Sequence, residues 1–201
     1  MKLKKIDVIG DRVILEPLSF RHLSGLEKVV NDGKLWKIKE TVIPHPSQLP
    51  DFLDEAEKGV KTGKQLVFVI INPEAQRIVG CTRLRCIDLS NKKAIIGPTF
   101  ISRSWQRSHV NTESKYLLLE QAFNVLKLNR VELHCDVLNS RSRRAIARLG
   151  ATEEGVIRQH RVMPDGRIRD TIVYSILQQE WPEIKQSLEL KMHEYEFSLS
   201  A

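Results

Sequence analysis

The chain has 201 residues, of which 41% are hydrophobic, 28% charged and 6% aromatic. This length fits one folding unit and excludes a multi-domain protein, and the composition excludes collagen-like, low-complexity and fully disordered chains. Lys and Arg number 32 against 25 Asp and Glu, so the formal net charge is +7, which favours anionic partners such as phosphorylated cofactors, nucleic acid or acidic proteins.

The predicted elements begin with a strand, two helices and three strands, identified by the spacing of apolar residues. In chain order they are a strand at Arg12–Leu18, a helix at Phe20–Val30 capped by Ser19, a loop at Thr41–Pro50, a helix at Asp51–Lys61, and strands at Leu66–Ile71, Arg77–Cys86 and Ala94–Ile101.

The second half of the chain predicts helices and strands in alternation. Apolar residues at helical spacing over roughly sixteen residues give the strongest helix, with Asn111 or Thr112 as its cap. The elements that follow are a strand at Arg130–Val137, a helix at Asn139–Leu149 ended by Gly150, strands at Thr152–Val162 and Arg169–Leu177 around a Pro164-Asp165-Gly166 turn, and a helical tail at Gln178–Phe197.

This order predicts an α/β fold with a mixed central sheet. A strand–helix–strand passage with one polarity needs a crossover, so we expect a parallel central pair with antiparallel hairpins on either side. The sheet should have about six to seven strands, flanked by helices. We expect one domain over residues 1–201, with a core at about 10–178 and a C-terminal helical tail at 179–201.

Other features concern the cellular setting. The longest apolar run, Leu66–Ile71, is strand-sized and too short to cross a bilayer. Met1–Asp11 lacks the apolar core and cleavage site of a secretory signal. Cys81, Cys86 and Cys135 form no CxxC pair, which disfavours both a zinc site and a disulfide framework. We expect a cytoplasmic protein without membrane contact or a metal ion.

Two polar segments lie where a predicted strand runs into a helix. One is Ser104–Glu113 (SWQRSHVNTE) and the other is Asn139–Arg144 (NSRSRR). The free N–H groups and the dipole of a helix N-terminus bind phosphate oxygens. Parallel strands that end side by side would place both segments at one sheet edge, so we expect a pocket for an extended polyphosphate cofactor. Taken singly, each segment could be an ordinary capped turn, and Asn139 only a helix cap.

Several longer phrases occur in order over nearly the whole chain. They are LEPL, AIIGPTFIS, WQRSHVNTESKYLLLEQAF, RVELHCDVLNSRSRRAIARLGA, EGVIRQH and PDGRIRDTIVYSILQQEWP. Together they resemble the GNAT superfamily of acetyl-CoA-dependent N-acetyltransferases, in its ribosomal-protein N-terminal acetyltransferase-like (RimJ/RimL-like) branch. The resemblance implies the single-domain GNAT fold, acetyl-CoA as acyl donor without a metal, and direct attack by a primary amine in a ternary complex.

The resemblance also implies a set of cofactor-binding residues. The first residue of the family's pyrophosphate loop corresponds to Gln106, but the two small positions of that loop are His109 and Asn111 here. A histidine at the first position could point away, crowd the phosphate or donate a hydrogen bond to it. A main-chain N–H of the 100–102 strand would polarise the thioester carbonyl. The residues assigned to the cofactor are Phe100, Ile101, Ser102, Gln106, Arg107, Ser108, His109, Val110, Asn111, Thr112, Asn139 and Ser142.

Two residues are candidates for proton transfer. Ile146 stands where many members of the family have a proton-donating tyrosine, so the branch's Asn-x-x-Ser spacing makes Ser142 the candidate donor to the departing thiolate. His134 is the candidate base, and strand alternation places Glu132, His134 and Asp136 on one face. The alternatives are a helix residue without catalytic duty for Ser142, a sheet-face histidine for His134, and catalysis chiefly by positioning.

The acceptor is left open by the sequence: a protein N-terminus, a polyamine, an amino acid or an antibiotic. The alternative function is a GNAT-like module that binds CoA or acyl-CoA without turnover, favoured by the absent glycines and tyrosine. Nucleic acid is not expected as the primary partner, because aromatic residues are few and Lys and Arg are dispersed. The resemblance allows for a homodimer. Glu113, Trp105, Trp181 and Cys135 are predicted to be structural.

Overall fold

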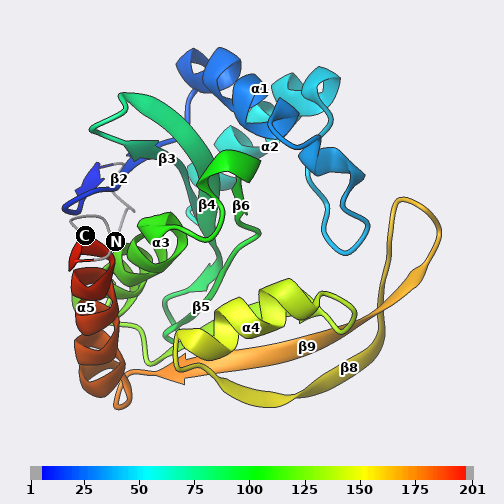
Figure 1. Cartoon of the computed structure of the whole chain (residues 1–201). Helices are drawn as coiled ribbons and strands as arrows, with labels where there is room; N and C mark the ends of the chain where they lie inside the picture. Colours follow the sequence, from blue (N-terminus) through cyan, green and yellow to red (C-terminus); the bar gives the residue numbers. More distant parts are fainter. Residues whose placement is uncertain (1–5, 198–201) are drawn as a thin grey trace.

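A computed structural model describes residues 6–197 of the chain (Figure 1); residues 1–5 and 198–201, which include the ends of the expected domain and tail, lie outside the described part. The strands are β1 (Val8–Ile9), β2 (Ile14–Pro17), β3 (Gln65–Asn72), β4 (Arg77–Asp88), β5 (Lys93–Ile96), β6 (Phe100–Ile101), β7 (Arg130–Asp136), β8 (Thr152–Val162) and β9 (Ile168–Leu177). The helices are α1 (Leu23–Asn31), α2 (Leu49–Lys61), α3 (His109–Glu120), α4 (Ser140–Arg148) and α5 (Trp181–Phe197).

The strands form one mixed sheet in the order β1-β2-β3-β4-β5-β7-β9-β8, with β6 paired to β4. The pair β5–β7 is parallel and the other pairs are antiparallel. The predicted α/β fold with a mixed sheet and a parallel central pair is therefore confirmed. The number of strands was underestimated, because the sheet has nine: β1 was not predicted, and the predicted strand Ala94–Ile101 is two strands.

The break between β5 and β6 has a local cause. Gly97 adopts a φ of 107°, a conformation that residues with a Cβ rarely adopt. Pro98 follows it and has no N–H to donate to a ladder. β5 therefore ends before Gly97, and the chain continues as β6, which also pairs with β4.

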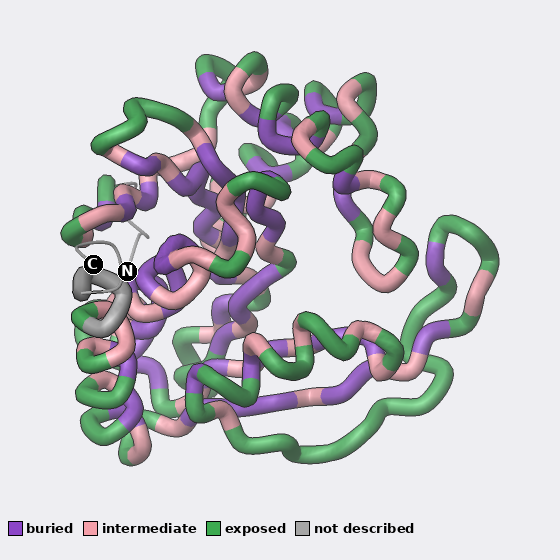
Figure 2. Tube along the Cα trace, in the orientation of Figure 1, coloured by how far each residue is buried: buried purple, intermediate pink, exposed green. Residues whose placement is uncertain are grey.

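Helices cover the two faces of the sheet unequally (Figures 1 and 2). Alternate residues of β3 face opposite sides: Leu66, Phe68 and Ile70 pack in the core with α3, α4 and α5, and Val67 and Val69 in a second core with α1 and α2. A strand buried on both faces reads as a continuous apolar run. On the α1–α2 side, β7 carries polar residues, and every residue of β8 is exposed.

The predicted starts of three helices shift in the structure. A 3-10 turn, Phe20–His22, precedes α1 and has Ser19 at its N-cap. Helix α2 begins at Leu49 instead of Asp51, because a proline is tolerated in the first helical turn. Ser108 caps α3 by accepting the Val110 N–H at 3.3 Å, so the prediction of Asn111 or Thr112 as the cap was wrong.

The C-terminal helix is held against α3. The Trp181 ring lies 6.0 Å from Tyr116 and 5.7 Å from Phe123, measured between centroids, and the Tyr116 hydroxyl donates to Glu189 at 2.8 Å. Trp181 is therefore a packing residue, as predicted, and Trp105 also packs against this core. Among residues 6–197 no helix is both long and apolar enough to cross a bilayer.

Glu113 joins the start of α3 to the chain ahead of β2. Its buried carboxylate accepts the N–H groups of Arg12 at 2.8 Å and Val13 at 3.1 Å, both through Oε1. Burial raises the pKa of Glu113, and these two backbone hydrogen bonds oppose the rise. The structural role predicted for Glu113 is confirmed.

We expect Glu113→Ala to destabilise the fold by about 2–4 kcal/mol, because two backbone N–H groups lose their acceptor inside the protein. Urea unfolding followed by circular dichroism measures the change. Glu113→Gln is the matched control: it keeps an Oε1 acceptor and should cost clearly less. Equal losses for the two variants would contradict the role given to these hydrogen bonds.

Candidate active site

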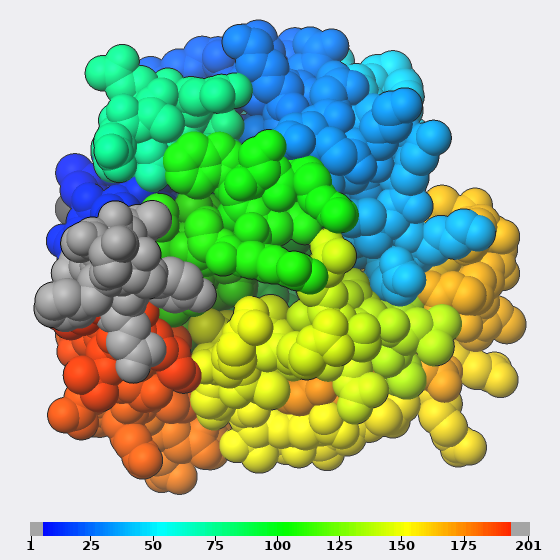
Figure 3. Space-filling model, in the orientation of Figure 1, coloured from blue at the N-terminus to red at the C-terminus, as the bar shows by residue number. Residues whose placement is uncertain are grey.

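The sheet parts between β6 and β7. The parallel ladder of β5 with β7 ends at the pair Ile96–Leu133. Beyond that point β6 stays paired with β4, whereas residues 134–136 of β7 stay paired with β9. We call the unpaired region between β6 and residues 134–136 the wedge. The molecular surface is hollowed between the green segment around residue 100 and the yellow-green start of α4 (Figure 3).

The starts of α3 and α4 both lie at the wedge. Helix α3 follows β6, and α4 follows β7. The Arg141 guanidinium of α4 donates to Oε1 of Gln106, just ahead of α3, at 2.8 Å, and Nε2 of Gln106 donates to the Ile101 carbonyl at 2.9 Å. The two polar segments predicted to meet are therefore in direct contact.

The surroundings of His109 fix the direction in which its side chain points. This side chain is 8% exposed and lies beside Arg12 and Glu74, where burial and the Arg12 charge lower its pKa. It therefore points into the protein body rather than into solvent at the helix start. Ahead of it, Arg107 is exposed and takes a left-handed φ of 65°.

One backbone N–H of β6 faces the wedge. The Ser102 N–H donates to the Val79 carbonyl of β4 at 2.9 Å, and N–H groups along a strand alternate in direction. The N–H of Ile101 therefore points away from β4, toward β7. Of the three residues 100–102, Ile101 is the one with a donor for a ligand in the wedge. The Phe100 side chain packs on Phe52 of α2, with ring centroids 6.1 Å apart.

The surroundings of the two helix starts suit an anionic ligand. Arg107, Arg141, Arg143 and Arg144 are exposed there. Asn139 caps α4, since its Oδ1 accepts the Ser142 N–H at 2.9 Å, and its amide NH₂ stays available as a donor. Helix-start N–H groups together with arginines bind phosphate oxygens well, so this donor set fits a nucleotide thioester with a pyrophosphate.

The side chains of Ser142 and His134 lie on opposite faces of β7. The Ser142 side chain reaches the Cys135 thiol, whose pKa is raised by burial; Cys135 is a core residue, as predicted. On the other face His134 contacts Glu132, with Nε2 and Oε2 2.8 Å apart. The two candidate catalytic residues do not touch, and the wedge runs between them.

The His134–Glu132 pair has the form of a base and its orienting carboxylate. Burial lowers the pKa of His134, Glu132 opposes this, and Arg85 and His160 lower it further. Arg130 donates to Glu132 at 2.9 Å. His134 therefore favours the neutral, proton-accepting form. Glu132 and His134 share a face as predicted.

Arg167 connects the end of β7 to the loop that precedes α2. It donates to Asp136 at the end of β7 and to the Lys39 carbonyl at 3.4 Å. The β8–β9 hairpin is thereby joined to the loop that precedes α2, and the two segments lie on the same side of the molecule in Figure 1. Asp136 is engaged in this contact and is not free to act with His134.

Sequence reasoning missed Lys115. Its ammonium is buried, without a carboxylate partner in residues 6–197, and donates to the hydroxyls of Thr82 and Thr99, which are 2.7 Å apart. Burial lowers the pKa of Lys115 to about 7. The sequence did hold a signal: Lys115 stands three and four residues before Leu118 and Leu119, on the buried stripe of α3.

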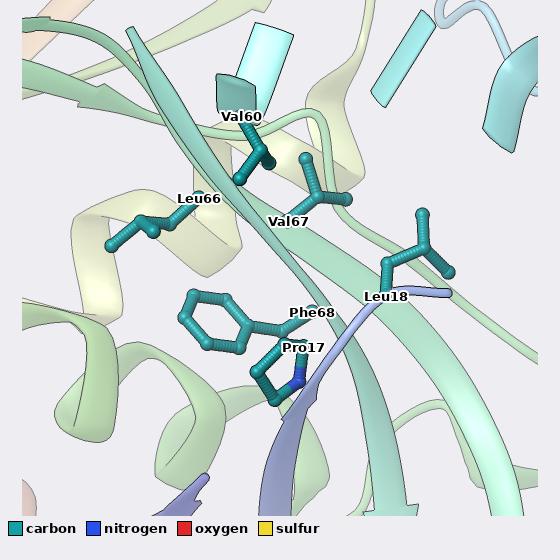
Figure 4. Close-up of a pocket in the computed structure, with 6 residues that line it drawn as sticks. All are labelled: Pro17, Leu18, Val60, Leu66, Val67 and Phe68. Carbon is teal, nitrogen blue, oxygen red and sulfur yellow. The ribbon is translucent and has the colours of Figure 1, made fainter. Parts of the chain in front are cut away.

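A small apolar pocket lies elsewhere, between the end of β2, the start of β3 and the end of α2 (Figure 4). It is lined by Pro17, Leu18, Val60, Leu66, Val67 and Phe68. No side chain there can transfer a proton or bind an ion. In residues 6–197 no three His, Cys, Asp or Glu side chains are grouped as metal ligands.

The chain is similar to known acetyltransferases in sequence and in structure. Residues 12–152 match the acetyltransferase (GNAT) domain family. YdaF of Bacillus subtilis, named provisionally as a ribosomal N-acetyltransferase, is 34% identical over 104 residues, which cover 52% of this chain but only 56% of YdaF. A GCN5-related N-acetyltransferase structure from Brucella melitensis is 30% identical, covers 96% of this chain and 87% of its own, and has a TM-score of 0.84.

Mycobacterium smegmatis RimJ in complex with CoA-disulfide is similar in fold, with a TM-score of 0.78 at 20% identity, over 89% of this chain and 88% of that one.

We expect Lys115→Met to raise stability at neutral and acidic pH. The pKa of Lys115 falls from 10.5 to about 7 on burial, so the unfolded chain holds the proton more tightly and wild-type stability rises with pH across this window. A pKa difference of 1 corresponds to about 1.4 kcal/mol, so the rise amounts to several kcal/mol. Urea unfolding from about pH 6 to 10 measures it. The rise of the free energy of unfolding with pH should vanish in Lys115→Met. It should persist in the control Lys58→Met, which changes an exposed lysine. A rise that persists in both variants would refute Lys115 as its source.

Proposed function

The chain belongs to the GNAT family of acetyltransferases, and on this basis we propose that it transfers an acetyl group from acetyl-CoA to a primary amine through the wedge. The observation that carries the proposal is the arrangement of the wedge itself. Two helix starts rich in N–H donors and arginines lie on one side of it, and a histidine–carboxylate pair lies on the opposite face of β7.

Acetyl-CoA would supply an activated thioester. The backbone N–H groups of Gln106 to Thr112 would hold its pyrophosphate, assisted by Arg107 and Arg141, while the amide NH₂ of Asn139 would bind the pantetheine arm. The bound CoA-disulfide of the similar RimJ structure supports this ligand class. Since Arg141 contacts Gln106 across the helix starts, it would turn from Gln106 to the phosphates.

The proton movements follow from the two faces of β7. His134, oriented by Glu132, would accept a proton from the acceptor ammonium, which frees the nitrogen lone pair to attack the carbonyl carbon. The Ile101 N–H would donate to the carbonyl oxygen as it gains charge. The C–N bond would form and the C–S bond would break. The nitrogen would lose its second surplus proton to solvent, while Ser142 would give its proton to the departing sulfur and be reprotonated from solvent.

We expect Ser142→Ala to lower kcat by about 100-fold or more, the lower end of the range for general-acid catalysis, without changing the Kd of acetyl-CoA. Thiol release over a panel of amines gives kcat, and isothermal titration gives Kd. An unchanged kcat would transfer the proton-donor role to water. Binding without thiol release in the wild type would favour the non-catalytic module instead.

Asn139→Ala should weaken acetyl-CoA binding in the same titration, since it removes the amide. It also removes the α4 cap, a loss of about 0.5–2 kcal/mol in stability. Asn139→Asp is the control, because its carboxylate keeps the cap while lacking the NH₂ donor. Weakened binding in Asn139→Ala alone would mean that the cap, and not the amide, matters.

We expect His134→Gln to remove the acidic limb of the kcat/KM profile against pH. In the wild type this limb should lie below the ordinary pKa of histidine, since burial, Arg85 and His160 lower the pKa of His134. Glu132→Gln should move it lower still, because the carboxylate that raises the pKa is gone. The acceptor amine contributes its own limb to the kcat/KM profile. This limb should be the same in wild type, His134→Gln and Glu132→Gln, so it is the internal control. A wild-type profile kept by His134→Gln would exclude His134 as the base.

A further inference from the structure

Arg83 is a partly buried charge without an ion pair in the described part of the chain. It lies on β4, and its Nε is buried without a hydrogen-bond partner. The guanidinium carbon stands 4.9 Å from the centre of the Phe52 ring. No carboxylate of residues 6–197 forms an ion pair with it; Glu55 acts on it only at longer range. Buried charges in proteins are normally paired, so the missing partner of Arg83 points to a ligand.

The position of Arg83 places that ligand at the wedge. The Arg83 carbonyl accepts the Gly97 N–H at 2.8 Å, and Arg85 Nε donates to the Gly97 carbonyl at 2.9 Å. Both arginines therefore flank the residue at which β5 ends. Phe100 of β6 packs on the same Phe52 ring that Arg83 covers, so the guanidinium lies next to one wall of the wedge.

Arg83 also shares a sheet face with the candidate base. Residues 83 and 85 of β4 point to the side opposite α3, since Leu84 lies in the α3 core and alternate residues face opposite sides. The Arg85 charge acts on His134. Their neighbours Leu84 and Leu133 both pair with Ile96, so two strand spacings, or about 10 Å, separate β4 from β7 where the sheet is still continuous. Arg83 and His134 lie just beyond this point, where the wedge opens.

The two carboxylates of β7 on this face are already paired. Glu132 is shared by Arg130 and His134, and Asp136 is paired with Arg167. Arg85 is partly engaged by Gly97 and Cys86. Arg83 and Arg169 both keep a buried Nε without a hydrogen-bond partner within residues 6–197, but Arg169 lies in the field of the Asp136 carboxylate. Arg83, next to the wedge, is therefore the guanidinium placed to bind a single carboxylate through two parallel N–H donors.

We propose, on the basis of the function above, that the acceptor carries a carboxylate a few bonds from its primary amine and that Arg83 binds this carboxylate while the amine faces His134. The acceptor class is then an amino acid, or a peptide with an acidic residue at its N-terminus. Arg83 sets acceptor specificity and takes no part in proton transfer.

The test compares matched acceptors: L-alanine with L-alaninamide, and an Asp-Ala-amide peptide with its Asn-Ala-amide counterpart. For at least one pair the wild type should prefer the carboxylate by about 10-fold or more in kcat/KM, a size expected for a buried charged hydrogen bond. Arg83→Gln should abolish this preference chiefly through KM, with little change for the amide, and Arg83→Lys should restore part of it. Arg148→Gln, on the exposed end of α4, removes the same charge and should change nothing.

A binding measurement keeps the two proposals separate. Titration of the same acceptors into the protein saturated with CoA needs no turnover. If wild type binds the carboxylate acceptor more tightly than Arg83→Gln does, the inference is supported, even if no thiol is released. The absence of thiol release would overturn the proposed function instead. Equal binding or turnover of carboxylate and amide, or an equal loss of both in Arg83→Gln, overturns the inference and leaves the acetyltransferase intact. Arg83→Met, which should fold because it removes an unpaired buried charge, repeats the test if the Gln variant is unstable.

Discussion

The interruption of one strand at Gly97 and Pro98 is the constraint on which the site depends. Because Gly97 takes a positive φ and Pro98 has no N–H, β5 cannot continue along β7. The β5–β7 ladder stops after Ile96, β6 keeps only the pairing with β4, and the edge of β7 beyond Leu133 is left unpaired on this side. A sheet that is otherwise continuous thereby acquires one place where a molecule on one face can meet a molecule on the other.

The charges around this opening differ between the two faces. On the side of α3 and α4 the donors are helix-start N–H groups and exposed arginines, which suit an elongated polyanion. On the opposite side a histidine and its carboxylate stand near an unpaired guanidinium, which suits a small ligand with charges of both signs. In the proposed function the two substrates would be separated by their electrostatics, with the reacting atoms at the break.

The start of α3 shows how a loop without glycine accommodates the larger side chain of His109. His109 turns inward beside Arg12, and one helical turn later Glu113 accepts the N–H groups of Arg12 and Val13. Both side chains therefore fix α3 to the chain ahead of β2. Since the His109 side chain is accommodated in the protein interior, it does not project over the helix start, where the proposed function places the pyrophosphate.

The sequence by itself determined the order of the elements, the parallel central pair, the cap at Asn139 and the common face of Glu132 and His134. These features depend on spacing between near neighbours in the chain, which periodicity reports directly. Only the tertiary structure decided that the strand after Ala94 divides in two and that His109 points inward. It also decided that, within residues 6–197, Lys115 is buried without a counter-ion and the Arg83 Nε is buried without a hydrogen-bond partner. Strand pairing and the environment of a buried charge are set by groups far apart in the sequence, and no local pattern records which of them come together.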